Sequence, residues 1–341
     1  MACSGTLAIM SYRDMFGTGK IIFGSRDEAM LQFTGSMKWF EDGKGWKSTQ
    51  GGFSAVKQIT TDENDMGAFF VRKMAGAAAL TFHLQKLIPV VFQRSDVHWG
   101  CGHFKPVLMT SILGNLALAG FYVSHLEDFK ISGAEEMGFG IAAALIVEAV
   151  VLMGFVLTTT LDKSPTIKAT KLPDGKGPNS IVSKILSRTF CCVTGVIALI
   201  AARDFFFTGH ELPFPPYDDI YLEWTGAFIH SPPSNSVEAE EHGMEAPLHI
   251  GNKFASRLLA LYLLIVSFQK FTSAFLVRVG KDNSGEKKCK MFWQTQALGN
   301  AFLLFTMRVF TAAAMSASLD FRWHVMSLGY ETFVLAIYAF M

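Results

Sequence analysis

The chain has 341 residues, of which 50% are hydrophobic and 17% are charged, and its formal net charge is +1. A soluble domain of this length carries about a quarter charged residues, and a nucleic-acid-binding domain shows a clear basic excess. The composition therefore argues against a soluble globular protein and against a nucleic-acid partner. The five cysteines are scattered, apart from an adjacent pair at 191–192, so no disulfide framework is predicted.

Apolar residues are gathered in blocks close to the roughly 20 residues that a helix needs to cross a bilayer. The predicted spans, in chain order, are 67–92, 107–124, 137–161, 185–209, 254–279, 291–315 and 324–341. The N-terminal segment 1–12 lacks the pattern of a cleaved signal peptide and predicts a helix of only about 18 Å, too short for a membrane core of about 30 Å. We expect an all-α polytopic membrane protein with about seven full spans and a short N-terminal helix, in contact with lipid.

The orientation of the spans follows from the basic residues of the loops. Loops 94–106, 162–184 and 280–290 hold eleven Lys and Arg, whereas the opposite loops 125–136, 209–253 and 315–322 hold three. This asymmetry predicts a cytoplasmic C-terminus. The loop 15–66 holds six Lys and Arg although it is expected outside, and at about 50 residues it is near the length at which the rule weakens.

Short motifs recur in the two halves of the chain in the same order. The first copies are RDMFGTG at 13–19, LQFTG at 31–35, Leu-Gly-Asn at 113–115, Asp-Phe at 128–129 and glycine 138. The second copies are RDFFFTG at 203–209, LEWTG at 222–226, Leu-Gly-Asn at 298–300, Asp-Phe at 320–321 and glycine 329. Arg72 and Lys86 similarly resemble Arg257 and Lys270. A near-constant offset predicts a tandem parallel duplication of a four-helix transmembrane unit.

The predicted domains follow from this duplication. The first four-helix repeat is 1–161, with the short helix 1–12, the outer loop 15–66 and three spans. A basic cytoplasmic linker over 162–184 leads to the second repeat, 185–341, whose outer loop 209–253 is acidic. That loop combines carboxylates and histidines, but no spacing matches a defined metal site, so a solvated acidic loop is the favoured interpretation.

Several polar side chains fall inside the predicted spans, where an unpaired charge is costly and marks a candidate functional site. They are Glu148, Lys86, Lys270, Asn115, Asn300, Arg308 and Glu331. Glu148 is the deepest, and Gly140 and Ala144 precede it on one helix face, which predicts close packing against another helix. The mixed signs of the charges predict pairing, with one of the two lysines as the partner of Glu148. The alternative is structural: the other charges lie near enough to helix ends to reach the interface, and buried asparagines often join helices.

Two charged pairs repeat at the predicted outer face, Arg13-Asp14 and Arg203-Asp204. They predict either a gate or binding element or, more simply, a helix end that anchors the following loop. His98, Cys101 and His103 could supply three ligands to a zinc ion, but a fourth is missing nearby, so no metal site is predicted. No cofactor can be identified from the residues.

Three functions remain open at this level. A transporter or channel, moving a small solute or ion through a polar centre between the repeats, fits the intramembrane charges and the duplication. A structural or assembly subunit of a larger membrane complex fits the broad apolar surfaces, and a homo-oligomer is equally open. A membrane enzyme acting on a lipid or quinone would need acid–base or metal groups that the sequence does not bring together, so the reading leans away from an enzyme.

Overall fold

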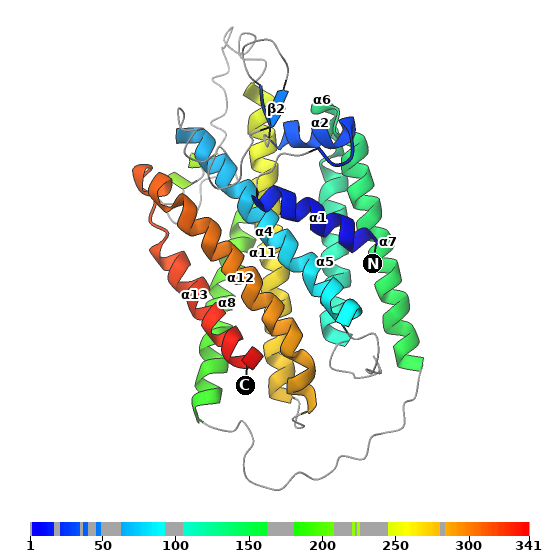
Figure 1. Ribbon diagram of the computed structural model, residues 1–341, viewed down its shortest axis with the longest axis vertical. Helices are drawn as coiled ribbons and strands as arrows, with labels where there is room; N and C mark the ends of the chain where they lie inside the picture. The colour runs from blue at the N-terminus through cyan, green and yellow to red at the C-terminus, as the bar shows by residue number, and fades with distance from the viewer. Residues whose placement is uncertain are drawn as a thin grey trace.

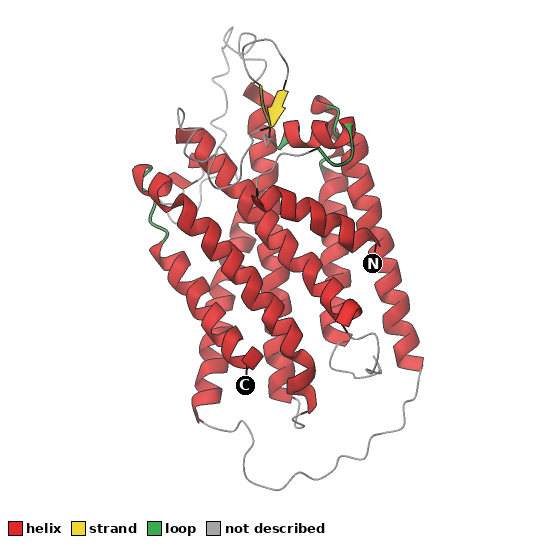
Figure 2. Cartoon of the chain, in the orientation of Figure 1, coloured by secondary structure: helices red, strands yellow, loops and turns green. Residues whose placement is uncertain are grey.

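The computed structural model is a bundle of long helices (Figures 1 and 2). The part of the chain that it describes comprises residues 2–16, 21–34, 37–39, 46–48, 63–92, 105–161, 181–207, 220–221, 224–225, 245–279 and 284–340. The only strands within these residues are β1 (Met37–Trp39) and β2 (Trp46–Ser48), a short antiparallel pair. The expected all-α class is therefore confirmed for the bundle itself.

The helices of the first half of the chain begin with a short one that ends later than predicted. They are α1 (Ala2–Phe16), α2 (Ser25–Phe33), α4 (Glu63–Phe92), α5 (Lys105–Ser124), α6 (Leu126–Ser132) and α7 (Glu135–Leu161). The second half contains α8 (Ile181–Phe207), α11 (Glu245–Val279), α12 (Ser284–Ser316) and α13 (Arg322–Phe340). Because α1 extends to Phe16, the Arg13-Asp14 pair lies within the helix rather than after it.

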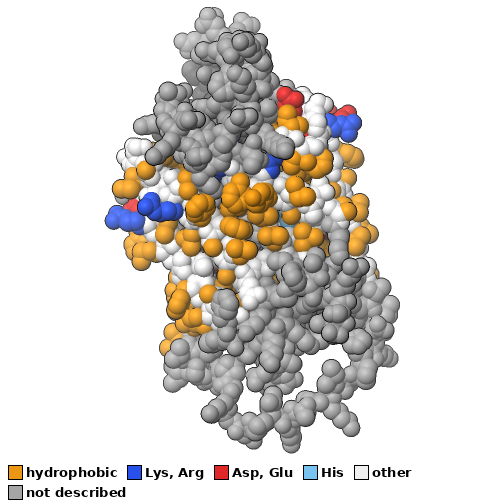
Figure 3. Space-filling view, in the orientation of Figure 1, with side chains coloured by type: hydrophobic (Ala, Val, Ile, Leu, Met, Phe, Trp, Pro, Cys, Tyr) orange, Lys and Arg blue, Asp and Glu red, His pale blue; other side chains and the backbone are white. Residues whose placement is uncertain are grey.

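Five helices are long and apolar enough to cross a membrane, which indicates an integral multi-pass membrane protein. The apolar stretches are Val107–Ser124, Glu135–Gly154, Arg188–Phe206, Ile250–Thr272 and Phe292–Ser316. The two other predicted spans correspond to α4 and α13. Helix α4 contains Arg72, Lys73 and Lys86, and α13 has only 19 residues. Figure 3 shows hydrophobic side chains over much of the visible described surface, with charged side chains at its upper right and at its left edge.

Helices α4 and α11 lie together near the centre of the bundle, and most of the described side chains of α4 are buried. Helix α1 crosses α4, α8 packs on α11, α5 packs on α7, and α12 packs on both α4 and α13. In Figure 1, α4, α7, α11 and α13 run in one direction and α5, α8 and α12 in the other. The C-terminus therefore lies at the end of the bundle where α4, α7 and α11 end.

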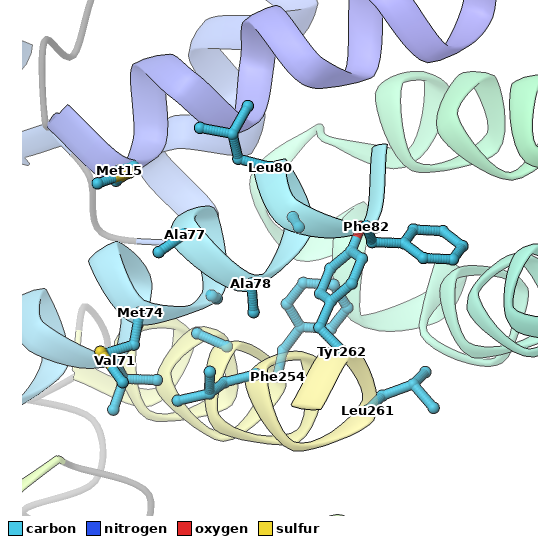
Figure 4. Close-up of a cluster of buried hydrophobic side chains, with 14 of the residues drawn as sticks. Met15, Val71, Met74, Ala77, Ala78, Leu80, Phe82, Phe254, Leu261 and Tyr262 are labelled. Atoms are coloured by element: carbon cyan, nitrogen blue, oxygen red, sulfur yellow. The ribbon is translucent and has the colours of Figure 1, made fainter. Parts of the chain in front are cut away.

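The core between α4 and α11 is apolar and tightly packed (Figure 4). Ala77 and Ala78 are fully buried, and these small side chains allow α4 to approach its neighbours closely. Tyr262 of α11 reaches the ring of Phe82 of α4, with 6.1 Å between the ring centroids. This core places α4 and α11, which carry the buried lysines Lys86 and Lys270, against each other.

Two groups of aromatic side chains within this core combine residues from both halves of the chain. In the first, Phe33 and Phe129 surround Phe254 of α11 at centroid distances of 5.6 and 5.1 Å. The second consists of Trp224, Phe321 and Phe70 of α4; Phe70 lies 5.4 Å from Trp224 and 5.1 Å from Phe321. Phe254 of the second half thus contacts Phe33 and Phe129 of the first half, and Phe70 of the first half contacts Trp224 and Phe321 of the second half.

Candidate functional site

The first polar centre is a closed triad of side chains from three helices of the first half. The ammonium of Lys86 on α4 donates to Glu148 Oε2 on α7 at 2.5 Å and to Asn115 Oδ1 on α5 at 2.9 Å. Asn115 Nδ2 donates to the same Glu148 oxygen at 2.9 Å. All three side chains are buried. Lys86 Nζ also lies 4.1 Å from the centre of the Phe82 ring, a favourable cation–π position.

The second polar centre repeats these contacts in the second half. Lys270 of α11 forms an ion pair and hydrogen bond with Glu331 Oε2 of α13, and it donates to Asn300 Oδ1 of α12 at 2.9 Å. Asn300 Nδ2 donates to Glu331 Oε2 at 3.1 Å. Thr194 of α8 adds a fourth member, donating to Glu331 Oε1 at 2.6 Å. The same three residue types, on three helices in the same order, therefore form both centres.

The structure thus brings six of the seven intramembrane candidates together in two groups of three, each within one half of the chain. It does not bring Arg308 to either group, because that side chain is exposed on the surface of α12. Each triad is compact: the carboxylate accepts from both the ammonium and the amide, and the amide oxygen accepts from the ammonium. Such mutual bonding offsets much of the cost of removing a charge from water.

The reason given above for the burial of Glu148 was wrong. Gly140, on the face thought to pack against a helix, is exposed, and a Cβ there would meet nothing within 4 Å. Glu148 is buried at 7% exposure because Lys86 and Asn115 cover its carboxylate. Polar bonding, and not a stripe of small residues, therefore determines the environment of this carboxylate.

Close helix contacts next to the triads are made by the glycine that precedes each asparagine. A Cβ at Gly299 of α12 would collide with the side chain of Thr81 of α4. A Cβ at Gly114 of α5 would in turn meet Ile265 of α11 and Phe82. Each half therefore inserts a glycine against the central helix of the other half. The small residue permits that approach.

Buried glutamines accompany these contacts one turn further along the central helices. Gln269 of α11 donates to Ser111 Oγ of α5 at 3.1 Å, next to the Ile265–Gly114 contact. Next to the Thr81–Gly299 contact, Gln85 of α4 takes the position of Gln269, and Gln296 of α12 takes the position of Ser111. Both amides are buried without a hydrogen-bond partner among the described residues. Buried amides of this kind are usually satisfied by water or a ligand.

The repeated Arg-Asp pairs are both close contacts, but their surroundings differ. Arg13 donates to Asp14 at 2.8 Å and, through Nη1, to both carboxylate oxygens of Asp27 on α2 at 2.7 and 2.6 Å. Asp27 also accepts from the backbone N–H of Ile22 at 2.7 Å. Arg13 therefore fastens the segment that follows α1. Arg203 donates to Asp204 at 2.6 Å, within α8.

The structural equivalent of Arg257 is Lys73, and not Arg72 as the order of motifs in the two halves predicted. Arg257 of α11 donates to the backbone carbonyl of Phe205 near the end of α8 at 3.1 Å. The corresponding contact on α4 is made by Lys73, which donates to the carbonyl of Met15 near the end of α1 at 3.2 Å. Arg72 instead contacts Asn252 of α11 at 2.5 Å. Cations placed at helix C-termini also interact favourably with the helix dipole.

Other predicted features lie outside this site. His98, Cys101 and His103, and most of the loops 15–66 and 209–253, lie outside the described residues. Among the described residues, no group of three or more His, Cys, Asp or Glu side chains could hold a metal ion. Gly138 packs on the ring of Phe129 whereas Gly329 has nothing within 4 Å of an added Cβ, so these two matched glycines have different environments.

The motifs matched between the two halves did not include the buried glutamines, although the sequence repeats them. Gln85-Lys86 and Gln269-Lys270 are the same dipeptide at an offset of 184 residues. Glu148 was likewise not matched with Glu331, because the shared glycines 138 and 329 suggested a different alignment of the last helix.

Comparison of the chain with protein-family models, with curated protein sequences and with solved structures gave no match.

Proposed function

We propose that the chain is a tandem duplication of one four-helix membrane unit and that α4 and α13 complete a set of seven spans. Four independent sets of contacts support this: the two Lys-Asn-Glu triads, the two aromatic clusters, the two glycine contacts, and the contacts of Lys73 and Arg257. Paired residues keep offsets from 183 to 192 throughout. The charges of α4 do not argue against a span, because α4 is enclosed by other helices.

We further propose that the protein is a transporter or channel for a small solute or ion. The observation that carries this proposal is the pair of buried triads on the two central helices. Intramembrane charges are costly and mark pathways or binding sites in membrane proteins. Both lysines project from α4 and α11, next to glutamines with incompletely bonded amides. A pathway along the contact of these helices would offer polar groups from both units, as in transporters with repeats.

A second candidate function is a structural subunit of a larger membrane complex, which the closed form of the triads favours. Glu148 already accepts two hydrogen bonds and Glu331 three, so the triads serve equally well as purely structural links between helices. A triad that only holds three helices together requires neither a bound solute nor a conformational change.

The experiment that separates these functions begins with the native mass of the tagged protein, extracted from its own membranes in mild detergent. A particle the size of a monomer or small homo-oligomer is expected, and its reconstitution into liposomes should give solute flux. Co-migration with a much larger assembly, together with no flux from the purified protein, would reject the transport proposal in favour of the subunit.

A further inference from the structure

An open cleft of about 530 Å³ is formed by residues of α5, α6, α8 and α11. It lies where three of the apolar stretches reach the same boundary. Ser124 ends the stretch of α5, Phe205 lies next to the end of the stretch of α8, and Arg257 lies near the start of the stretch of α11, which runs in the opposite direction (Figure 1). The cleft is therefore at one surface of the membrane, at the level of the lipid headgroups. Its wall contains no residue of the Lys-Asn-Glu triads.

Two opposite charges in the wall of this cleft have no charged partner among the described residues. Arg257 donates from Nε to the carbonyl of Phe205 at 3.1 Å and lies 5.4 Å from the centre of that ring. No described residue accepts a hydrogen bond from its two other nitrogens. Asp128 of α6 forms neither a hydrogen bond nor an ion pair with a described residue, and thus does not pair with Arg257. The cleft therefore offers a cation and an anion to a ligand that carries both charges.

An apolar face of α5 continues from the cleft toward the middle of the membrane. Leu113, Leu116 and Gly120 recur at helical spacing on this face, and all three are exposed. Gly120 also lines the cleft, and a Cβ added to it would meet nothing within 4 Å. Among the described residues, no side chain fills the space beside Gly120, so an acyl chain can lie there against the helix.

We propose that the cleft binds one phosphatidylethanolamine molecule, with its phosphate at Arg257, its ammonium at Asp128 and an acyl chain over Gly120. A guanidinium forms directed, charge-assisted hydrogen bonds to phosphate oxygens. Ethanolamine is favoured over choline because a primary ammonium donates hydrogen bonds to a carboxylate and a quaternary ammonium cannot. The volume of the cleft is within the range of small-molecule sites. The site does not depend on the proposed transport function, since a structural subunit could bind the same lipid.

Binding is tested by native mass spectrometry of the purified full-length protein, with dioleoyl lipids added to the detergent. Saturable retention of one phosphatidylethanolamine molecule is expected. Phosphatidylcholine and phosphatidylglycerol should bind at least about 10-fold more weakly, the effect of losing one hydrogen bond between charged groups. Glycerophosphoethanolamine, which has the same headgroup without acyl chains, should bind more weakly than the intact lipid because it cannot occupy the face of α5.

Two variants test the two ends of the lipid separately. Asp128→Asn should reduce the affinity for phosphatidylethanolamine to that for phosphatidylcholine and leave the latter unchanged. Gly120→Leu should weaken the binding of both lipids at least about 10-fold, because the new side chain occupies the position of the acyl chain. Both variants should fold, since Asp128 loses no contact with a described residue and a side chain at Gly120 enters open space.

The matched controls are Glu127→Gln, at an exposed carboxylate of the same helix, and Gly140→Leu, at an open glycine position of α7. Both should bind phosphatidylethanolamine as the wild type does. Equal retention of the three lipids by the wild type would overturn the proposal, as would a preference for phosphatidylglycerol. Wild-type affinity for phosphatidylethanolamine in either folded variant, Asp128→Asn or Gly120→Leu, would also overturn it. Binding of glycerophosphoethanolamine as tight as that of the lipid would reject the lipid as the occupant.

Discussion

Glu148 and Lys86 form a buried ion pair with 2.5 Å between the carboxylate and the ammonium, although they are 62 residues apart in the chain. Asn115 bonds to both. Lys270, Asn300 and Glu331 form the equivalent group in the second half. The pairing explains why an apolar helix such as α7 tolerates a carboxylate near its middle, and it fixes α4, α5 and α7 relative to one another.

Loss of one partner should therefore destabilise the bundle. Glu148→Leu leaves the Lys86 ammonium buried without its carboxylate, and we expect a loss of about 3–5 kcal/mol of stability. The double variant Lys86→Met, Glu148→Leu removes both charges and should recover most of it. Thermal unfolding in detergent measures both effects. Glu127→Gln is the matched control, since that carboxylate is 83% exposed; a double variant no more stable than Glu148→Leu would contradict the pairing.

The two triads should be independent of each other. In double-mutant cycles, Lys86 should couple to Glu148 and Lys270 to Glu331, each by about 0.5–3 kcal/mol, the range for residues in one network. The crossed pairs Lys86 with Glu331 and Lys270 with Glu148 should show coupling within experimental error of zero. A crossed coupling as large as the direct one would show that the lysines exchange partners, and the two-centre description would then be wrong.

Glycine contacts provide a steric test of how the halves meet. A Cβ at Gly299 would collide with Thr81, so Gly299→Ala should separate α12 from α4 and lower the thermal unfolding temperature by several degrees. Gly140→Ala adds the same methyl group where nothing lies within 4 Å and should have little effect or a slightly stabilising one. Equal unfolding temperatures in the two variants would contradict the close approach of α4 and α12.

His125, in the turn between α5 and α6, should make stability depend on pH. Burial lowers its pKa below the ordinary value of about 6.5, and Arg257 and Lys253 act in the same direction. The unfolded chain therefore binds the proton more readily, so the contribution of neutral His125 is present above about pH 6.5 and is lost as the pH falls through that value.

His125→Gln should accordingly remove part of the loss of stability between pH 7.5 and 5.5. The quantity to measure is the change in unfolding temperature between these two pH values, compared between the variant and the wild type. His324→Gln, at an exposed position of α13, serves as the control. An unchanged pH dependence in His125→Gln, or an equal change in the control, would contradict the assignment.

The sequence predicted the class of the fold because long apolar blocks have few structural alternatives. It also identified all six triad residues, because a charge or amide inside an apolar helix is visible without a structure. The partners were not predictable: Lys86 and Lys270 were equally good candidates for Glu148, and only the three-dimensional structure, in which Lys86 reaches Glu148 and Asn115, decides between them. The bonding of Glu331 to Lys270 was similarly hidden, because the glycines at 138 and 329 suggested a different alignment of the last helix.

The burial of Arg13 and Asp27 shows a related limit. The Arg13-Asp14 pair was recognisable from its repetition, but Asp27 lies in another helix. Nothing in the sequence marks Asp27 as the carboxylate whose two oxygens accept from Arg13 Nη1. Contacts between distant segments depend on helix rotation, which the composition of an all-round apolar helix does not determine.

Solute flux in liposomes reconstituted with Glu148→Gln and with Glu331→Gln, at equal amounts of folded protein, tests the central claim most directly. This substitution preserves the shape of each side chain and removes only its charge. If the triads serve transport, both variants should lose most of the flux while still unfolding cooperatively. Wild-type flux in both folded variants would contradict the account and leave the triads as internal ties of the bundle.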